Sequence, residues 1–328
     1  MYLLNVLLFV LGLVLLIKGG DWFVDGATGI ARRLHMPELL IGATVVSIGT
    51  TLPEVMVSAG AALEGHGEIA YGNAVGSIIC NTALIAALSM LFRPAKTERR
   101  ALVLPSVFFF GAAAVYAASA YLWGGFSRAS GALLLAIFLI YMVLSLIRIP
   151  RPDRPEAVMP LEEQKENASK RGEGYRDVLL LIVGAALIAF GADLLVDNGI
   201  VLARAMGVPE SVVALTFVAL GTSLPELVTA VTSLIKGHGA LSLGNIIGAN
   251  LFNLVLVSSV SILLSPFSVP SSPQLMGQPL SLVLDLPLAI GAMAILALPT
   301  LIGGRTFRLQ GGVLLLLYVG FCVLQFAL

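Results

Sequence analysis

The feature that most constrains the fold of this chain is an internal repeat. Residues 19–81 align with residues 191–253 without a gap, at a constant offset of 172, and 22 of the 63 aligned positions are identical. The shared positions include prolines, asparagines and acidic residues, which apolar core packing does not by itself select. The chain therefore contains two copies of one structural unit.

Long apolar stretches place both copies in a membrane. Hydrophobic residues make up 58% of the chain and charged residues only 12%, whereas a soluble domain is about 25% charged. About 20 apolar residues are enough for a transmembrane helix. We predict ten such helices, at residues 2–31, 37–63, 68–92, 101–123, 129–148, 177–205, 210–235, 240–264, 279–301 and 306–328.

The longest polar stretch separates the two copies. Residues 149–176 are rich in proline, glutamate and lysine, a composition typical of a flexible linker. It divides a first five-helix repeat, 1–148, from a second, 177–328. Because five is odd, the repeats must cross the membrane in opposite directions. We therefore predict an all-α membrane protein with ten transmembrane helices as two inverted five-helix repeats, the architecture of many secondary transporters.

The basic residues predict the orientation. If the N-terminus lies outside, sixteen lysines and arginines fall on the inner side, and only Arg128 and Arg204 fall on the outer side. Cytoplasmic loops carry such an excess, so we expect a protein of the cell (inner) membrane with both termini outside and a cytoplasmic linker. The expected partners are the lipid bilayer and transported ions; we predict no nucleic-acid partner, and no protein partner is evident.

One six-residue block occurs in both repeats, as Gly-Thr-Thr-Leu-Pro-Glu at 49–54 and Gly-Thr-Ser-Leu-Pro-Glu at 221–226. A proline inside a helix removes a backbone hydrogen bond, so we expect both helices to be broken there. Each block ends in a glutamate, Glu54 or Glu226. Two such carboxylates repel each other unless a proton or a cation lies between them. An oxygen-rich site with two carboxylates suits a hard cation, above all Ca²⁺.

A second repeated motif lies in the next helix of each repeat. Residues 72–81 and 244–253 share two glycines four positions apart and a final asparagine. Glycines at this spacing allow close helix packing. Ser77 and Asn81 are four residues apart and lie on one helix face, where their oxygens could face the glutamates. The pattern leaves packing and ligand roles open.

Together these two motifs resemble the repeats of the cation/calcium exchanger superfamily, and most of all its prokaryotic sodium/calcium exchangers. The resemblance implies an antiporter that exchanges Na⁺ for Ca²⁺ by alternating access, with no cofactor beyond the transported ions and no enzymatic activity. It implies that Ca²⁺ is held by Glu54, Glu226, Thr50 and Thr222. It implies that Na⁺ is held by Thr51, Ser223, Ser77, Asn81, Asn253 and the backbone carbonyls of Ser47 and Ala219.

Two positions depart from the family pattern. Ala249 stands where the family often has a serine, so one sodium-ligand hydroxyl is missing. Asn253 stands where several members have aspartate, which argues against potassium co-transport. Proton/calcium exchangers usually carry an extra acidic residue where this chain has Asn81 and Asn253, so the pattern favours Na⁺ over H⁺. An H⁺/Ca²⁺ antiporter and a passive cation channel remain as alternatives.

The first helix of each repeat carries two aspartates four residues apart, Asp21 and Asp25 in the first repeat and Asp193 and Asp197 in the second. Either they form an ion-entry vestibule, or they cap helices and form local pairs at the aqueous end. The sequence favours the local role.

Overall fold

The structure is a computed structural model, and it describes residues 2–147, 161–206, 221–271, 274–275 and 277–327. Within these ranges, nine helices are long and apolar enough to cross a membrane. A shorter apolar helix, Leu224–Ile235, is the described part of the predicted span 210–235. The molecule is an all-α membrane protein, as predicted.

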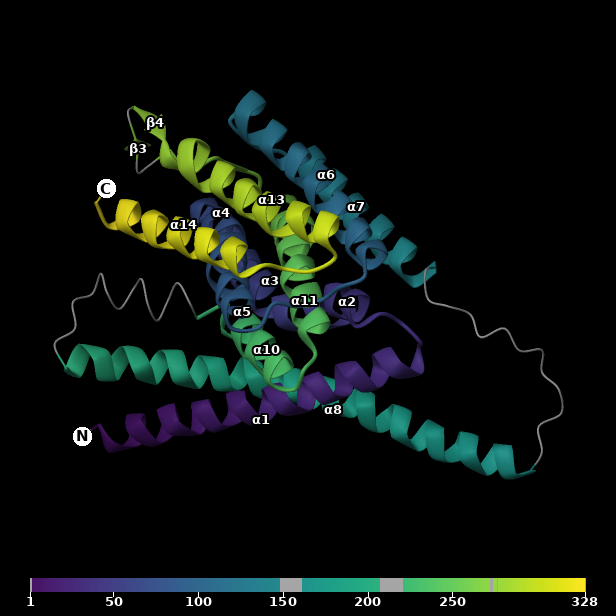
Figure 1. Cartoon of the computed structure of the whole chain (residues 1–328). Coiled ribbons are helices and arrows are strands. Elements are labelled where there is room, and N and C mark those ends of the chain that lie inside the picture. The colour runs from purple at the N-terminus through teal and green to yellow at the C-terminus, as the bar shows by residue number, and fades with distance from the viewer. Residues whose placement is uncertain (1, 148–160, 207–220, 272–273, 276, 328) are drawn as a thin grey trace.

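The first repeat contains five long apolar helices, from Leu3–Arg33 to Arg128–Ile147; Figure 1 shows how they are arranged. The second and third of these helices each contain a π-helical segment, labelled η. The elements in chain order are α1 (Leu3–Arg33), α2 (Glu38–Ile41), η1 (Gly42–Val46), α3 (Ser47–Leu63), α4 (Gly67–Ile79), η2 (Cys80–Ala86), α5 (Ala87–Phe92), α6 (Arg99–Trp123) and α7 (Arg128–Ile147).

The second repeat follows the same order. Its elements are α8 (Leu161–Ala205), α10 (Leu224–Ile235), α11 (Gly239–Phe252), η4 (Asn253–Val257), α12 (Ser258–Leu264), η5 (Ser281–Asp285), α13 (Leu286–Gly303) and α14 (Arg308–Ala327). Among the described residues, the strands are two residues long and lie in loops. They are β1 (Gly125–Phe126), which pairs with β2 (Phe267–Ser268), and β3 (Gln274–Leu275), which pairs with β4 (Gln278–Pro279).

The pairing of α1 with α8 displays the symmetry of the repeat. The two helices run side by side along one side of the molecule (Figure 1). A methyl group at Gly12 would meet the backbone of Gly191, and a methyl group at Gly19 would meet the backbone of Gly184. Gly184 and Gly191 are the repeat equivalents of Gly12 and Gly19. The contact of Gly12 with Gly191 is therefore equivalent, by the symmetry of the repeat, to the contact of Gly184 with Gly19. The two helices are antiparallel, as an inverted repeat requires.

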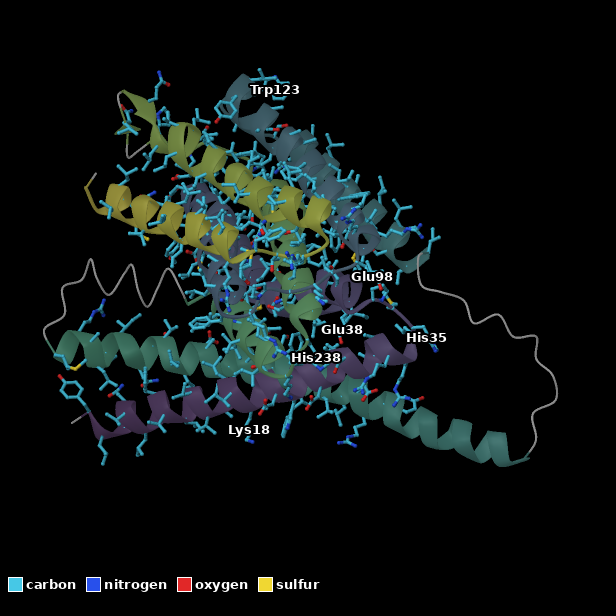
Figure 2. All side chains as sticks on the ribbon, viewed as in Figure 1. Lys18, His35, Glu38, Glu98, Trp123 and His238 are labelled. Atoms are coloured by element: carbon cyan, nitrogen blue, oxygen red, sulfur yellow. The ribbon has the colours of Figure 1, made fainter. Side chains whose placement is uncertain are left out.

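The connecting loops gather on two faces. On one face, Arg93 donates a hydrogen bond to the carbonyl of Leu234, and the backbone N–H of Thr97 donates to Gly304. On this face the side chains of Glu38 and His238 also point toward each other (Figure 2), 2.7 Å apart. On the other face, β1 pairs with β2. Loops predicted to share a side of the membrane therefore lie together.

Helix α11 lies among the other helices, between the two repeats. All twelve residues from Leu241 to Phe252 are buried, and α11 contacts α2, η1, α3 and α10. This packing is close because Gly244 and Gly248 lack side chains. A methyl group at Gly244 would overlap the backbone of Leu39, and one at Gly248 would overlap Ser47. The glycine motif of the second repeat is therefore a packing motif.

The structure corrects the predicted linker in part. Residues 148–160 lie outside the described residues, but α8 already begins at Leu161, inside the stretch predicted to be flexible. The physical reason is composition, because residues 161–171 are rich in Glu, Gln, Lys and Arg, which have high helix propensity. Their charge excludes them from the hydrocarbon core without preventing a helix.

The structure also corrects the predicted break in the first repeat. Helix α3 continues through Pro53 as an α-helix, and the irregular turn lies earlier, in the π-helical segment η1. Neighbouring helices and side chains can satisfy the carbonyl that a membrane proline frees, so the helix need not end there. In the second repeat a turn at 221–223 precedes α10; the first part of the predicted span, up to residue 220, lies outside the described residues, so the break there stays a prediction.

Candidate cation site

The two repeated glutamates lie at the contact between the repeats. Glu54 is on α3 and Glu226 is on α10, and neither has any exposed surface. The two helices are in contact, and the two carboxyl groups are close enough to interact electrostatically. All four carboxylate oxygens lack a hydrogen-bond partner among the described residues. Burial of unpaired carboxylates is costly, so this pair requires a compensating ligand.

Hydroxyl groups accompany each glutamate. Thr50 and Thr51 precede Glu54 by about one turn of α3, and both are buried. Ser223 precedes Glu226 by three residues and is buried as well, whereas Thr222 is half-buried in the turn before α10. The hydroxyls of Thr51 and Ser223 have no hydrogen-bond partner in the described parts of the chain. Both are free to face a ligand.

Two repeat-related asparagines add amide groups. Asn81 lies in η2 and Asn253 begins η4, and both are fully buried. Neither the oxygen nor the nitrogen of either side chain has a hydrogen-bond partner within the described ranges. Ser77, one turn before Asn81, is also buried. The sequence left packing and ligand roles open for these residues, and their unpartnered amides favour the ligand role.

The remaining predicted ligands are backbone carbonyls. Ser47 begins α3 and is fully buried. Its hydroxyl donates to the carbonyl of Gly42 at 2.7 Å, across the π-helical segment. Ala219 lies outside the described residues. The described side chains of the predicted site come from four spans that contact one another. Helix α3 contacts α10, α4 and η4, and α10 contacts η2.

Sequence reasoning missed two asparagines that organise the site. Asn245 Oδ1 accepts a hydrogen bond from Thr50 Oγ1 at 3.2 Å. Asn73 Nδ2 donates to the backbone carbonyl of Glu54 at 3.2 Å. Both residues belong to the repeated motif, so their recurrence was a usable signal. The adjacent glycines had suggested helix packing as the reason for it.

The aspartates of the first helices lie outside this cluster. Lys236, at the end of α10, lies 2.8 Å from Asp25 and 3.5 Å from Asp21. Asp193 and Asp197 show no ion pair within the described ranges, and the residue equivalent to Lys236 is Glu64. The first pair of aspartates therefore has the local pairing role that the sequence favoured.

The donor set has a definite chemical character. It consists of two carboxylates, several hydroxyls and two amides, and every one of these groups except Thr222 is buried. In the described part of the chain, no group of three or more histidine, cysteine, aspartate or glutamate residues could hold a metal. Oxygen donors of this kind suit hard cations rather than transition metals. The cluster can therefore bind a cation that neutralises the two glutamates.

Comparisons with known proteins agree with this chemistry. The sodium/calcium exchanger protein family matches residues 4–147 and 177–327. The sodium/calcium exchanger MaX1 of Methanosarcina acetivorans is 32% identical over 99% of both chains. The inner membrane protein YrbG of Escherichia coli is 37% identical over 80% of this chain and 81% of its own length.

A solved structure shares the fold along almost the whole chain. The sodium-calcium exchanger NCX_Mj, in a crystal soaked with Na⁺ and Sr²⁺, is similar with a TM-score of 0.78 and 30% sequence identity. The similarity covers 97% of this chain and 98% of NCX_Mj. The matches to both repeats and the shared fold together identify the family of this chain. This multi-pass membrane protein belongs to the sodium/calcium exchanger protein family, whose members are transporters and not enzymes.

Proposed function

We propose that the chain is a secondary active antiporter that exchanges Na⁺ for Ca²⁺. One observation carries the proposal. Glu54 and Glu226, from opposed repeats, are fully buried close together with four unpartnered carboxylate oxygens. A divalent cation between them removes both charges at once. Two of the similar proteins, MaX1 and NCX_Mj, are named as sodium/calcium exchangers.

The calcium site is the pair of glutamates with Thr50 and Thr222. Ca²⁺ takes six to eight oxygen ligands, and the two carboxylates supply up to four of them. The backbone carbonyls of the two threonines supply the next, beside the proline of each block. Thr222 is the more exposed of the two, so its side of the site is where the ion enters or leaves.

The sodium sites flank the calcium site. They consist of Thr51, Ser223, Ser77, Asn81, Asn253 and the carbonyls of Ser47 and Ala219. Ala249 is fully buried and has no hydroxyl, so the site on its side has one oxygen fewer than its counterpart at Ser77. Exchange follows because Na⁺ and Ca²⁺ compete for the same two carboxylates, and a cavity without either cation holds unpaired buried charge.

The choice of Na⁺ over H⁺ rests on the two buried asparagines. Asn81 and Asn253 offer oxygen ligands but cannot accept a proton near neutral pH. A proton-driven exchanger needs groups that gain and lose protons during the cycle, and among the described ligands of the proposed site only the two glutamates are acidic. Sodium binding uses the amide oxygens as they stand.

Alternating access requires one part of the molecule to move against another. The α1–α8 pair packs together through glycines along one side of the molecule, and it is the natural moving body. The face that carries Arg93, Lys96, Lys236 and Arg305 is cytoplasmic, by the positive-inside rule. The membrane is the inner membrane, as the name of the relative YrbG suggests.

Calcium uptake into proteoliposomes tests the proposal. Vesicles loaded with Na⁺, K⁺ or acidic buffer are compared, and only the outward Na⁺ gradient is expected to drive uptake. Glu54→Gln and Glu226→Gln serve as controls that should abolish uptake. Uptake driven by a pH gradient without sodium would establish the H⁺/Ca²⁺ antiporter instead. A steady conductance without any counter-ion would establish a channel, and near-normal flux in either control would refute the site assignment.

A further inference from the structure

Two asparagines that the repeat makes equivalent both bind the same helix, α3. Asn245 comes from α11 in the second repeat and is fully buried. Its Oδ1 lies 3.2 Å from the donor Thr50 Oγ1 and 3.3 Å from Ser47 Oγ. Its backbone carbonyl also lies 3.1 Å from Ser47 Oγ. The second repeat thus holds the part of α3 that precedes Pro53.

Asn73, its equivalent in the first repeat, binds α3 on the other side of Pro53. Its Nδ2 donates to the backbone carbonyl of Glu54 at 3.2 Å and to Ser58 Oγ at 2.8 Å. Pro53 lacks an N–H and weakens the helix at this point. The two amides therefore form hydrogen bonds to α3 on both sides of Pro53. Asn245 accepts one from Thr50 before the proline, and Asn73 donates to the carbonyl of Glu54 after it.

The α10 side of the site lacks the same partners. The residues equivalent to Ser47 and Ser58 are Ala219 and Ala230, neither of which has a hydroxyl. Asn245 Nδ2, the equivalent of the nitrogen that holds Glu54, has no hydrogen-bond partner among the described residues. The α10 half of the site therefore lacks the two hydroxyl groups that, on the α3 half, lie within hydrogen-bond distance of Asn245 and Asn73.

We infer that Asn73 and Asn245 are positioning residues that fix the α3 half of the cation site. The α10 half, which lacks the two hydroxyls and contacts both α1 and α8, is the half whose ligands shift when the α1–α8 pair moves. This inference rests on the proposed function. Its physical basis is that cation ligands must be held within about 0.5 Å of their productive positions. The two amides hold Thr50 and Glu54 without contributing a ligand themselves.

The first test measures the calcium KM and the maximal rate of Asn73→Ala and Asn245→Ala in proteoliposomes. Each variant is expected to raise the KM roughly three- to tenfold, the effect of one lost hydrogen bond. Asn198→Ala is the matched control. Asn198 is buried on α8 and bonds to Asn5 and to the carbonyl of Leu194, so this variant should lower thermal stability and leave the KM unchanged. A wild-type KM in Asn245→Ala would overturn the inference.

A double-mutant cycle separates positioning from a general loss of structure. Thr50→Val removes the hydroxyl that donates a hydrogen bond to Asn245 and keeps the backbone carbonyl of residue 50. If Asn245 acts through this bond, Thr50→Val and Asn245→Ala should have non-additive effects on the KM. Fully additive effects would show that Asn245 does not position Thr50, even if both variants fold less well.

A restored hydroxyl tests the mobile half. Ala230→Ser gives α10 the group that Asn73 uses on α3, and Asn245 Nδ2 is the donor available to it. The maximal rate is expected to fall roughly threefold or more, with an unchanged calcium KM. An unchanged rate would overturn the assignment of α10 as the moving half. Failure of the wild-type protein to exchange would refute the proposed function itself, whereas normal wild-type exchange with unaffected variants refutes only this inference.

Discussion

Helices α3 and α10 carry nearly the same six-residue block in different surroundings. Both blocks end in a fully buried glutamate with unpartnered oxygens. Helix α3, however, runs through its proline, whereas α10 begins only after a turn. The identical residues determine what the site binds, and the non-identical neighbours determine how firmly each half is held. An inverted repeat in one transport state must be asymmetric in structure, although its sequence is nearly symmetric.

The same contrast extends to the flanks of the two blocks. The glycine motif of α11 is packed tightly against α2 and α3, whereas Gly72 is exposed. A methyl group there would meet nothing within 4 Å among the described residues. Lys236 bonds to aspartates of α1, while its equivalent Glu64 carries the opposite charge. Equivalent positions can therefore be compared by matched substitutions.

The largest expected effect comes from the glutamates, and it should be equal in the two repeats. Glu54→Gln and Glu226→Gln each remove a charge that binds the cation. Each should lower calcium exchange roughly a hundredfold or more, since loss of one buried charge partner costs about 3 kcal/mol or more. In cation-free buffer each variant should raise the Tm, because a buried unpaired carboxylate is removed.

Radioactive calcium uptake and thermal unfolding in detergent measure both effects. Substantial exchange in only one variant would show that the two glutamates are not equivalent ligands. A lowered Tm in both cation-free variants would show that the carboxylates are stabilised by protein groups instead of by the transported ion.

The next effect separates the two glycine motifs. Gly244→Ala places a methyl group against the backbone of Leu39, and overpacking of this kind costs about 1–3 kcal/mol. Gly72→Ala, at the equivalent position, should cost little and gain helix propensity. Thermal unfolding of the two purified variants tests the difference. Equal destabilisation would mean that Gly72 is packed as closely as Gly244.

Much of this molecule could be predicted from sequence, for identifiable reasons. Membrane spans follow from apolar length, and the inverted arrangement follows from a gap-free repeat with an odd number of spans. The candidate site was proposed from Glu54 and Glu226, because ionisable residues in mid-membrane are functional by default, and the structure places both glutamates in full burial on helices that contact each other. The loops lie together on the two faces as the predicted order of spans requires.

Other features could not be predicted because tertiary contacts decide them. The π-helical segment η2 contains neither proline nor glycine, and η1 contains only Gly42, a residue type that also occurs within ordinary α-helices of this chain. The proline predicts a helix end at Pro53, but α3 continues, and on either side of Pro53 it donates a hydrogen bond to Asn245 and accepts one from Asn73. Which end of an asparagine amide binds which neighbour depends on packing, and no spacing rule encodes it.

A smaller effect concerns the proposed sodium ligands, because Ala249 occupies the position in the second repeat that Ser77 occupies in the first. Ala249→Ser restores the hydroxyl and should lower the sodium KM by roughly threefold to fivefold, the effect of one added polar contact. Ser77→Ala removes the equivalent hydroxyl and should raise the sodium KM by a similar factor. Sodium titrations of calcium efflux measure both variants. A calcium KM that changes as much as the sodium KM would place these positions in the calcium site.

The smallest effect concerns the ion pairs of Lys236. Lys236→Met removes contacts to Asp21 and Asp25, but these carboxylates are 40% and 54% exposed, so the loss should be about 0.5 kcal/mol. Glu64→Lys places a lysine at the equivalent position, next to Asp193 and Asp197 if the second repeat can adopt the arrangement of the first. It should then stabilise the protein by a similar amount. Because exposed charges are screened by salt, both differences should disappear in 1 M salt. Unfolding measured at low and high salt tests this. Because methionine keeps a similar apolar stem, an effect of Lys236→Met that persists at high salt would mean that the hydrogen bond from Lys236 Nζ to the backbone carbonyl of Asp21, and not the charge pair, holds α10 against α1.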